Sequence, residues 1–207
     1  VEENLQFFAA LFGVTVEESY ELVAPIYRQI EPFRKRRAGK LSGGMKQKLA
    51  LSCALIHRPK VLLLDEPTTG VDAVSRSEFW EMLAGLKKHG ITILVSTPYM
   101  DEASRCDRIA LCNEGQILGI DTPNGIVQGF DSPLYGIKAR NMFALLETAR
   151  NADGVTDCYP FGEWHHIVTD GSFNPDMFIR EFERIDGLEI TPVEPTIEDM
   201  FIKLMKR

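Results

Sequence analysis

The sequence predicts two structural units, an α/β layer structure followed by a small α+β domain. Two short apolar runs, Val61–Leu64 and Ile91–Val95, alternate with helical patterns, which is typical of a buried parallel sheet covered by helices. In the last third of the chain the order of the patterns changes to β-α-β-β-α-β. We therefore expect the units to span residues 1–125 and 126–207, with the boundary at the turn-forming segment Asp121–Gly125.

The helices of the first unit follow from apolar periodicity and from residues that start or end helices. Gly13 ends the first helix, the capping box Thr15-Val16-Glu17-Glu18 opens the second, and Pro59 stops the third. Asp72 is expected to cap the fourth. The expected helices cover residues 5–12, 15 onwards, 43–57, 72–88 and 100–106, and the strands of a following hairpin cover 108–112 and 116–120.

The second unit has the order of elements of a ferredoxin-like split β-α-β domain, with one further helix at its end. The expected strands cover residues 134–139, 155–160, 165–169 and 188–192, and the expected helices cover 141–151, 175–185 and 197–206.

Composition indicates a globular protein and argues against several other classes. The 207 residues are 44% hydrophobic and 26% charged, which suits a chain with a buried core. A net charge of −7 argues against a dedicated nucleic-acid binder, which is usually basic. No apolar run reaches the roughly 18 residues that span a bilayer. The four cysteines form no C-x-x-C pair, so we expect reduced thiols rather than a metal or redox site.

The tripeptide Ser42-Gly43-Gly44 opens the third helix. A helix start leaves free N–H groups and the positive end of the helix dipole, which attract phosphate. The glycines let the backbone approach closely, and the serine adds a hydroxyl donor. Taken alone, the tripeptide is more typical of an ordinary helix cap, but Gln47 behind it and an acidic strand end ahead favour phosphate binding.

Two adjacent carboxylates, Asp65 and Glu66, follow the first apolar strand. Open α/β sheets bind ligands at the carboxyl ends of their strands. An aspartate at this place suits Mg²⁺, directly or through water. The neighbouring glutamate can orient and deprotonate an attacking water. The alternative is a solvated acidic strand end with no chemical role.

Together these segments resemble the catalytic half of an ATP-binding cassette (ABC) ATPase, and the match covers about residues 1–120. The segments similar to the family's signature motif, Walker B strand, D-loop and switch region are, respectively, Leu41–Gln47, Val61–Glu66, Gly70–Asp72 and Ser96–Ala103. The tail Glu194–Ile202 resembles the end of ATPase subunits from drug-export and related ABC-2 transporters.

The resemblance implies ATP and Mg²⁺ as cofactors and a head-to-tail pair of nucleotide-binding domains, identical or different. Ser42-Gly43-Gly44, together with Gln47, would bind the γ-phosphate of ATP held by the partner. Asp65 would hold Mg²⁺ and Glu66 would act as the catalytic base for this domain's own nucleotide. Asp72 would link the two sites across the interface.

Two features depart from the family pattern. No phosphate loop of the form G-x-x-x-x-G-K-[ST] occurs, and Val1–Leu5 resembles the segment after the glutamine loop, so about a hundred family residues are expected upstream. The switch position that usually holds histidine is Pro98, which has no donor. We expect the chain alone to hydrolyse little or no ATP, because phosphoryl transfer depends on positioning and charge. Compensation for Pro98 by its neighbours is the alternative.

The resemblance therefore implies the ATP-binding subunit, or a piece of one, of an ABC exporter. Such a subunit is cytoplasmic and is held on the inner face of the membrane by a transmembrane permease. It is not expected to bind nucleic acid. A first alternative is a non-catalytic partner that supplies a signature motif in trans. A second is a soluble ABC protein that acts on ribosomes or DNA, against which the acidic balance and the transporter-like tail argue.

For three further features of the sequence we expect a structural role rather than a binding site. Arg34-Lys35-Arg36-Arg37 is expected to form a solvated charged face, with contact to a membrane partner as the alternative. His165-His166 is expected to be a pair within a strand rather than a metal site, and Phe79 and Trp80 to be packing residues of a helix.

Overall fold

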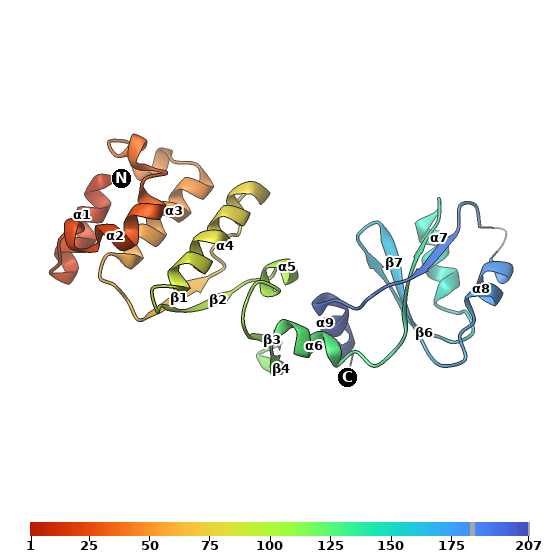
Figure 1. The fold of residues 1–207 in the computed structure, drawn as a ribbon. Coiled ribbons are helices and arrows are strands. Elements are labelled where there is room, and N and C mark those ends of the chain that lie inside the picture. Colours follow the sequence, from red (N-terminus) through yellow and green to blue (C-terminus); the bar gives the residue numbers. More distant parts are fainter. Residues whose placement is uncertain (183–184, 207) are drawn as a thin grey trace. The chain divides into compact units, whose positions relative to one another are not determined.

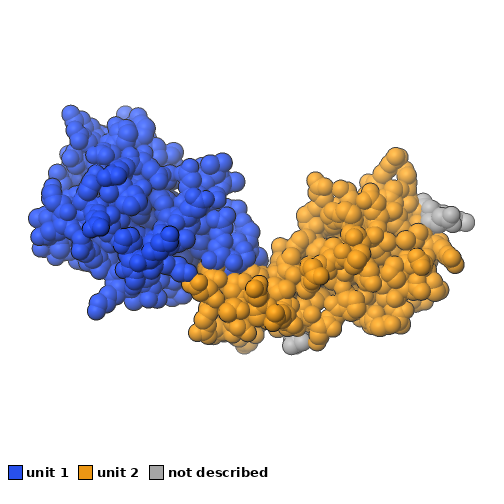
Figure 2. All heavy atoms as spheres, viewed as in Figure 1, with its two compact units in different colours: residues 1–105 blue, residues 106–207 orange. Residues whose placement is uncertain are grey.

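The computed structural model describes residues 1–182 and 185–206, arranged in two compact units, 1–105 and 106–207 (Figures 1 and 2). This division falls 20 residues before the boundary expected from the sequence (125 − 105). The hairpin around Asn113–Gly115 accounts for the difference, since it belongs with the following helix, which packs on its second strand.

Unit 1 contains a group of helices and a pair of parallel strands, which α4 (Ala73–Lys87) connects (Figure 1). Its longest elements are α1 (Glu2–Phe12), α2 (Val16–Tyr27), α3 (Gly43–Leu55), β1 (Val61–Asp65), α4 (Ala73–Lys87) and β2 (Thr92–Ser96). Short 3₁₀ turns cover Glu31–Phe33 and Ala38–Lys40, and α5 covers Met100–Ala103. Helix α3 packs against α1, α2 and α4 around a core that includes the fully buried side chains of Leu5, Ile26, Ile30, Leu55 and Ile56.

The expected helix caps are confirmed. The Thr15 hydroxyl accepts from the backbone N–H of Glu18, and the Glu18 carboxylate accepts from the N–H of Thr15 at 2.9 Å. Gly13 ends α1 with a φ of 67°, a conformation that favours glycine. Asp72 caps α4 by accepting from the N–H of Ser75. These caps are made by residues that lie within about one and a half helical turns of each other, which explains why the sequence predicts them.

Helix ends without a strong cap differ from the expectation by a few residues. Helix α1 begins at Glu2 rather than at residue 5, because the N–H of Glu2 donates to the carbonyl of Arg34, a contact that the local pattern does not reveal. Helices α3 and α5 end two and three residues earlier than expected, at Leu55 and Ala103.

The prediction that β1 and β2 are buried is wrong for one of their faces. The strands pair in parallel, with Leu63 opposite Leu94, and these side chains are 70% and 66% exposed. Leu62, on the other face of β1, is only 5% exposed. A continuous apolar run predicts that other elements pack on both faces of the sheet. In the described residues this sheet has two strands, and helices cover only one face.

Unit 2 begins with an antiparallel hairpin and then forms a four-stranded antiparallel sheet in the order β6-β7-β5-β8 (Figure 1). From residue 134 onward the element order expected from the sequence is confirmed, whereas the helix α6 (Pro123–Gln128) was not expected. Its elements are β3 (Ile109–Asn113), β4 (Gln116–Asp121), α6 (Pro123–Gln128), β5 (Leu134–Lys138), α7 (Met142–Ala149), β6 (Val155–Phe161), β7 (Trp164–Thr169), α8 (Pro175–Glu181), β8 (Glu189–Pro192) and α9 (Ile197–Met205). Residues 183 and 184 of the expected helix 175–185 lie outside the described residues.

The two faces of the four-stranded sheet are covered differently. One face packs with α7 and α8 around a core of Ile137, Leu145, Ile167 and Phe178. The other face contacts α9 through a buried polar cluster, because the carboxylate of Asp199 accepts from Tyr159 at 2.8 Å and bonds His166 at 2.7 Å. The order and pairing of the strands place Tyr159 and His166 directly opposite each other on this face.

The histidine pair lies within a strand and the aromatic pair is buried on a helix, as expected. His165 and His166 lie on β7, where His165 donates to the carbonyl of Met142 at 2.7 Å. Phe79 and Trp80 are buried on α4. None of the helices within 1–182 and 185–206 combines the length and hydrophobicity needed to cross a bilayer.

Candidate functional site

The glycine motif lies at the start of α3 and packs closely on the segment that precedes α4. Ser42 is the N-cap, and its hydroxyl accepts from the N–H of Met45 at 3.4 Å. A Cβ on Gly43 would lie 3.4 Å from the carbonyl oxygen of Gly70. A Cβ on Gly44 would lie 2.9 Å from the side chain of Ser75, closer than real side chains approach. Packing inside the unit thus requires a glycine at position 44, whatever the motif binds, whereas a Cβ at position 43 would make only an ordinary contact.

Gln47 and Asp72 belong to the same group of residues. Gln47 lines a small hollow with Gly44, Thr68 and Val71. Asp72 accepts from the N–H of Ser75 at 2.9 Å, and this backbone hydrogen bond lowers the pKa of the Asp72 carboxyl below its usual value. The aspartate therefore carries its negative charge at neutral pH. Residues from the signature-like and D-loop-like segments are brought together here.

Asp65 and Glu66 lie at the carboxyl end of β1, next to the end of β2. Asp65 pairs with Ser96 in the register of the sheet, and the Ser96 hydroxyl donates to the Asp65 carboxylate. The N–H of Glu66 donates to the Ser96 carbonyl at 3.0 Å and approaches its hydroxyl at 3.1 Å. One serine thus fixes both the side chain of the aspartate and the backbone of the glutamate.

The chain turns sharply at Glu66. Its φ is 42°, in the left-handed region that residues other than glycine seldom adopt. The Thr69 hydroxyl donates to the Glu66 carboxylate at 3.1 Å. Both residues at the strand end, Asp65 and Glu66, are exposed to solvent. Strained backbone is often found at functional sites, where surrounding contacts maintain it.

A buried glutamate, Glu102, connects this strand end to the switch-like segment. Its side chain is 2% exposed and accepts from the hydroxyls of Thr68 at 2.7 Å and Thr97 at 2.6 Å. Arg76 approaches Glu102 at 3.6 Å and stacks over Tyr99 at 4.6 Å. Sequence reasoning missed this cluster. Its one local signal, an acidic residue in the first turn of α5, is common to many helices.

Pro98 lies between two residues of this cluster. The Tyr99 N–H donates to the Thr97 hydroxyl at 3.2 Å, so the backbone on both sides of the proline is held. The proline itself has no N–H and no polar side chain. The cluster around Glu102 therefore orders the switch-like segment but supplies no donor at position 98.

The described contacts form two groups rather than one continuous site. Ser42–Gln47 packs on 70–75, whereas Asp65 and Glu66 bond Ser96 and Thr69. Among the residues that the structure describes, no hydrogen bond or ion pair joins Ser42 to either carboxylate, and no three acidic, histidine or cysteine side chains gather as a metal site. The oxygens of Asp65 and Ser96 are of the hard type that Mg²⁺ prefers when water and phosphate complete its shell.

Comparisons with known proteins agree with this arrangement. Residues 13–69 match the family model described as "ABC transporter". Over its whole length the chain is 34% identical to "Nod factor export ATP-binding protein I" of Burkholderia pseudomallei (strain K96243) and covers 68% of that relative. The chain belongs to the ABC transporter ATP-binding proteins.

Other members of the family match over different lengths. The chain is 39% identical to the "Probable multidrug ABC transporter ATP-binding protein YbhF" of Escherichia coli (strain K12), over 99% of this chain and 36% of that protein. The chain thus spans about a third of the length of this ABC relative. A solved structure titled "Structure of ATP binding subunit of ABC transporter" aligns with a TM-score of 0.52 and 29% identity, covering 62% of this chain and 55% of that one. These matches establish a mixed α/β fold of the ABC ATPase kind.

Proposed function

We propose that this chain is the ATP-binding subunit, or part of the subunit, of an ABC exporter that couples hydrolysis of Mg-ATP to transport. The observation that carries the proposal is the pair Asp65 and Glu66 at the end of a parallel strand, held by Ser96. The name of the Nod factor relative refers to export and that of the YbhF relative to a multidrug transporter, and the first of these supports the export direction.

In this proposal the two carboxylates have different roles. Asp65, with the hydroxyl of Ser96 beside it, would hold Mg²⁺, which would supply positive charge to the phosphates of ATP. Glu66 would orient and deprotonate the attacking water. Its hydrogen bond from Thr69 and the turn at its backbone support this role, because both restrict where the carboxylate can lie.

The glycine motif would serve a second nucleotide-binding domain. Ser42-Gly43-Gly44 would bind the γ-phosphate of ATP held by that domain, with Gln47 behind them and Asp72 at the interface. The free N–H groups at the start of α3 and the close packing of Gly43 on Gly70 support this assignment. A head-to-tail pair of such domains, identical or different, would complete two sites.

For the rest of the chain we propose a ferredoxin-like domain that contributes to dimerisation or regulation, with a functional boundary near residues 125 and 126. The strand order β6-β7-β5-β8 and two helices on one face support this assignment. The remaining partner would be a transmembrane permease, which would hold the subunit on the inner face of the membrane. Nucleic acid would not be a partner.

A second candidate function is a non-catalytic partner that supplies only the glycine motif in trans. Pro98 favours it, because the switch-like segment carries no donor at that position for a phosphate. In that case the carboxylates of this chain would not contribute to turnover.

The test is ATP hydrolysis by the complex that this protein forms with membrane components in its own cells. We expect a permease to copurify in mild detergent, Glu66→Gln to lower turnover by roughly 10²–10⁴, and Ser42→Arg to abolish it by filling the phosphate position. Glu114→Gln, in an exposed turn of the hairpin, is the matched control.

The outcomes separate the candidates. Loss of turnover in both site variants supports a catalytic subunit. Loss with Ser42→Arg alone supports the non-catalytic partner. Turnover that neither variant changes, or a protein that copurifies with no permease, contradicts the proposed function.

A further inference from the structure

The most unusual charge distribution in the chain lies between α2 and α3. Residues 28–40, which we call the basic loop, contain six cationic side chains and the single acid Glu31, a net charge of +5. Because the whole chain carries −7, the remainder carries −12 (−7 − 5). The six cations are Arg28, Arg34, Lys35, Arg36, Arg37 and Lys40.

The cations of the basic loop are exposed, and carboxylates do not neutralise them. All six residues are exposed, and no ion pair to a described carboxylate involves any of them. By contrast, Lys48 pairs with Glu78 and Arg76 with Asp101 in the same unit. The contacts that the loop cations do make are with rings, since Arg36 lies 4.4 Å from the centre of Phe33. Their charge is therefore available to a partner.

The backbone of the basic loop is held in place. The amino group of Val1 donates to the carbonyl of Arg36 at 2.9 Å, and the N–H of Glu2 donates to that of Arg34 at 3.0 Å. Ile30 anchors the start of the loop in the core with no exposed surface. The cations thus project from a fixed framework rather than from a free tail.

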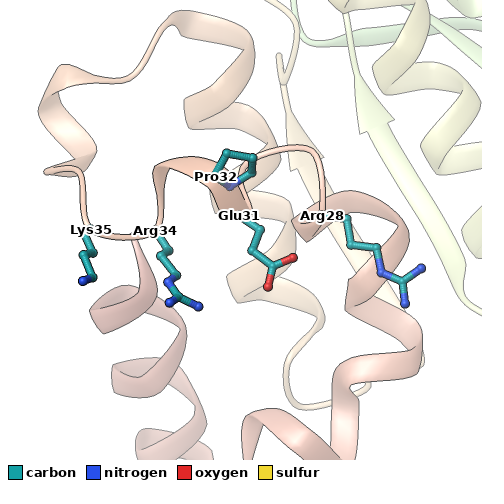
Figure 3. A pocket seen from close by; sticks show the side chains of 5 residues that line it. All are labelled: Arg28, Glu31, Pro32, Arg34 and Lys35. Atoms are coloured by element: carbon teal, nitrogen blue, oxygen red, sulfur yellow. The ribbon is translucent and has the colours of Figure 1, made fainter.

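Part of the loop surrounds an open depression of about 460 Å³. Figure 3 shows Arg28, Glu31, Arg34 and Lys35 extending to the same side of the loop. Pro32 is the one apolar residue of the lining. Such a surface lacks the apolar pocket that would anchor a protein segment, and it suits a broad layer of negative charge.

We propose that the basic loop docks on the anionic headgroups of the membrane that contains the permease. This inference rests on one part of the proposed function, the location of the subunit at the membrane. Each Lys or Arg near an anionic membrane raises binding roughly fivefold. The negative charge of the rest of the chain would be repelled by the same surface, so the protein would bind with the basic loop toward the lipid.

The test is co-sedimentation of the purified 207-residue protein with vesicles that contain no other protein. Phosphatidylcholine vesicles are compared with vesicles in which about a third of the lipid is phosphatidylglycerol, at roughly 0.1 M and 0.5 M salt. The loop variant replaces Arg34, Lys35, Arg36 and Arg37 by Gln, which keeps the two backbone carbonyl contacts. The control variant replaces four exposed cations elsewhere by Gln, so both variants carry −11 (−7 − 4); these cations are Lys60, Lys88, Arg108 and Arg180.

We expect binding to the anionic vesicles only, loss of binding at the higher salt, and at least a tenfold weaker binding of the loop variant than of the control. Absence of binding to anionic vesicles, or an equal loss in both variants, would overturn the proposal. Binding to an acidic polypeptide such as polyglutamate, without binding to vesicles, would also overturn it in favour of a protein partner. Because the vesicles contain neither permease nor ATP, either result leaves the proposed function to be judged by its own test.

Discussion

At the scale of single residues, hydrogen bonds between distant parts of the chain determine where the charged groups lie. Ser96 orients Asp65 and holds the backbone of Glu66, so a serine with no charge of its own sets the geometry of both carboxylates. In unit 2 Asp199 has a similar role. It is fully buried and accepts from Tyr159, bonds His166 and caps α9 through Thr196.

Asp199→Asn tests this buried cluster. Burial alone raises the pKa of the Asp199 carboxyl, but hydrogen bonds from His166, Thr196 and Tyr159 outweigh it and hold the pKa below its usual value. The carboxylate therefore stabilises the fold above its unfolded pKa of about 3.9, and this contribution is lost as the pH falls through the folded pKa. We expect the variant to be less stable by about 1.5–3 kcal/mol at pH 7, because a neutral amide cannot replace the charge-assisted hydrogen bonds of the buried carboxylate with Tyr159, His166 and Thr196.

Urea unfolding at several pH values measures this effect. The difference in stability between wild type and Asp199→Asn should begin to narrow below about pH 4, where the unfolded carboxyl is protonated, and should narrow further as the pH falls toward the lower folded pKa. Asp186→Asn, which removes an exposed ion pair with Arg140, is the control and should change stability little. A difference that does not depend on pH would contradict the assigned role of the charge.

At the scale of secondary-structure elements, one face of the β1–β2 sheet and the start of α3 show how packing overrides local pattern. All four residues of the run Val61–Leu64 are apolar, but only Leu62 is buried, Leu64 is half-buried, and Val61 and Leu63 are exposed. The start of α3 has two glycines, of which Gly44 is required by the contact with Ser75. Whether a side chain is buried, and how closely two backbones approach, depends on how two elements pack together.

Leu62→Ala and Leu63→Ala compare the two faces of β1. Leu62 is buried, so its truncation should cost about 2–4 kcal/mol through lost burial and a cavity. Leu63 is exposed in this chain, so the same change should cost less than about 1 kcal/mol. Urea unfolding monitored by circular dichroism measures both. Equal losses would indicate that the exposed face is covered in solution.

Gly44→Ala tests the contact between α3 and the segment before α4. The new methyl group would meet Ser75 at 2.9 Å, and overpacking of this kind typically costs about 1–3 kcal/mol. Gly85→Ala is a matched control inside α4, because a Cβ there meets no atom within 4 Å. It should stabilise the helix by about 0.5–1 kcal/mol. Recovery of the Gly44→Ala loss by Ser75→Gly would confirm the cause, and a neutral Gly44→Ala would contradict it.

At the scale of the whole molecule, each unit has its own hydrophobic core. Leu55 lies in the core of unit 1 and Leu145 in that of unit 2, and neither has exposed surface. The chain has two tryptophans, and the structure places one in each unit, Trp80 in the first and Trp164 in the second. Each tryptophan can therefore report the state of its own unit.

Leu55→Ala and Leu145→Ala are expected to act on different units. Each truncation of a buried leucine should destabilise its own unit by about 2–5 kcal/mol. Fluorescence is measured in backgrounds with one tryptophan, Trp164→Phe for unit 1 and Trp80→Phe for unit 2. Leu55→Ala should lower the urea midpoint reported by Trp80 and leave that reported by Trp164 unchanged. Midpoints that shift together would show that the units unfold as one.

The sequence by itself determined the features that depend on near neighbours. The cap at Thr15, the turn at Gly13 and the start of α4 at Asp72 are made by residues close to one another in the sequence. Apolar periodicity and turn-forming residues likewise predicted the order of the strands and helices, apart from the short helix α6. The motif residues of the candidate site could be named for the same reason, since each motif is a continuous segment.

Only the tertiary structure decided which of these segments meet and which surfaces are covered. Thr68 and Glu102 are 34 positions apart, and Tyr159 and Asp199 are 40 apart. The exposure of Leu63 depends on how many elements cover the sheet, which the apolar run does not encode. Local patterns report interactions within one turn or one strand, whereas burial and buried hydrogen bonds arise from elements that the fold brings together.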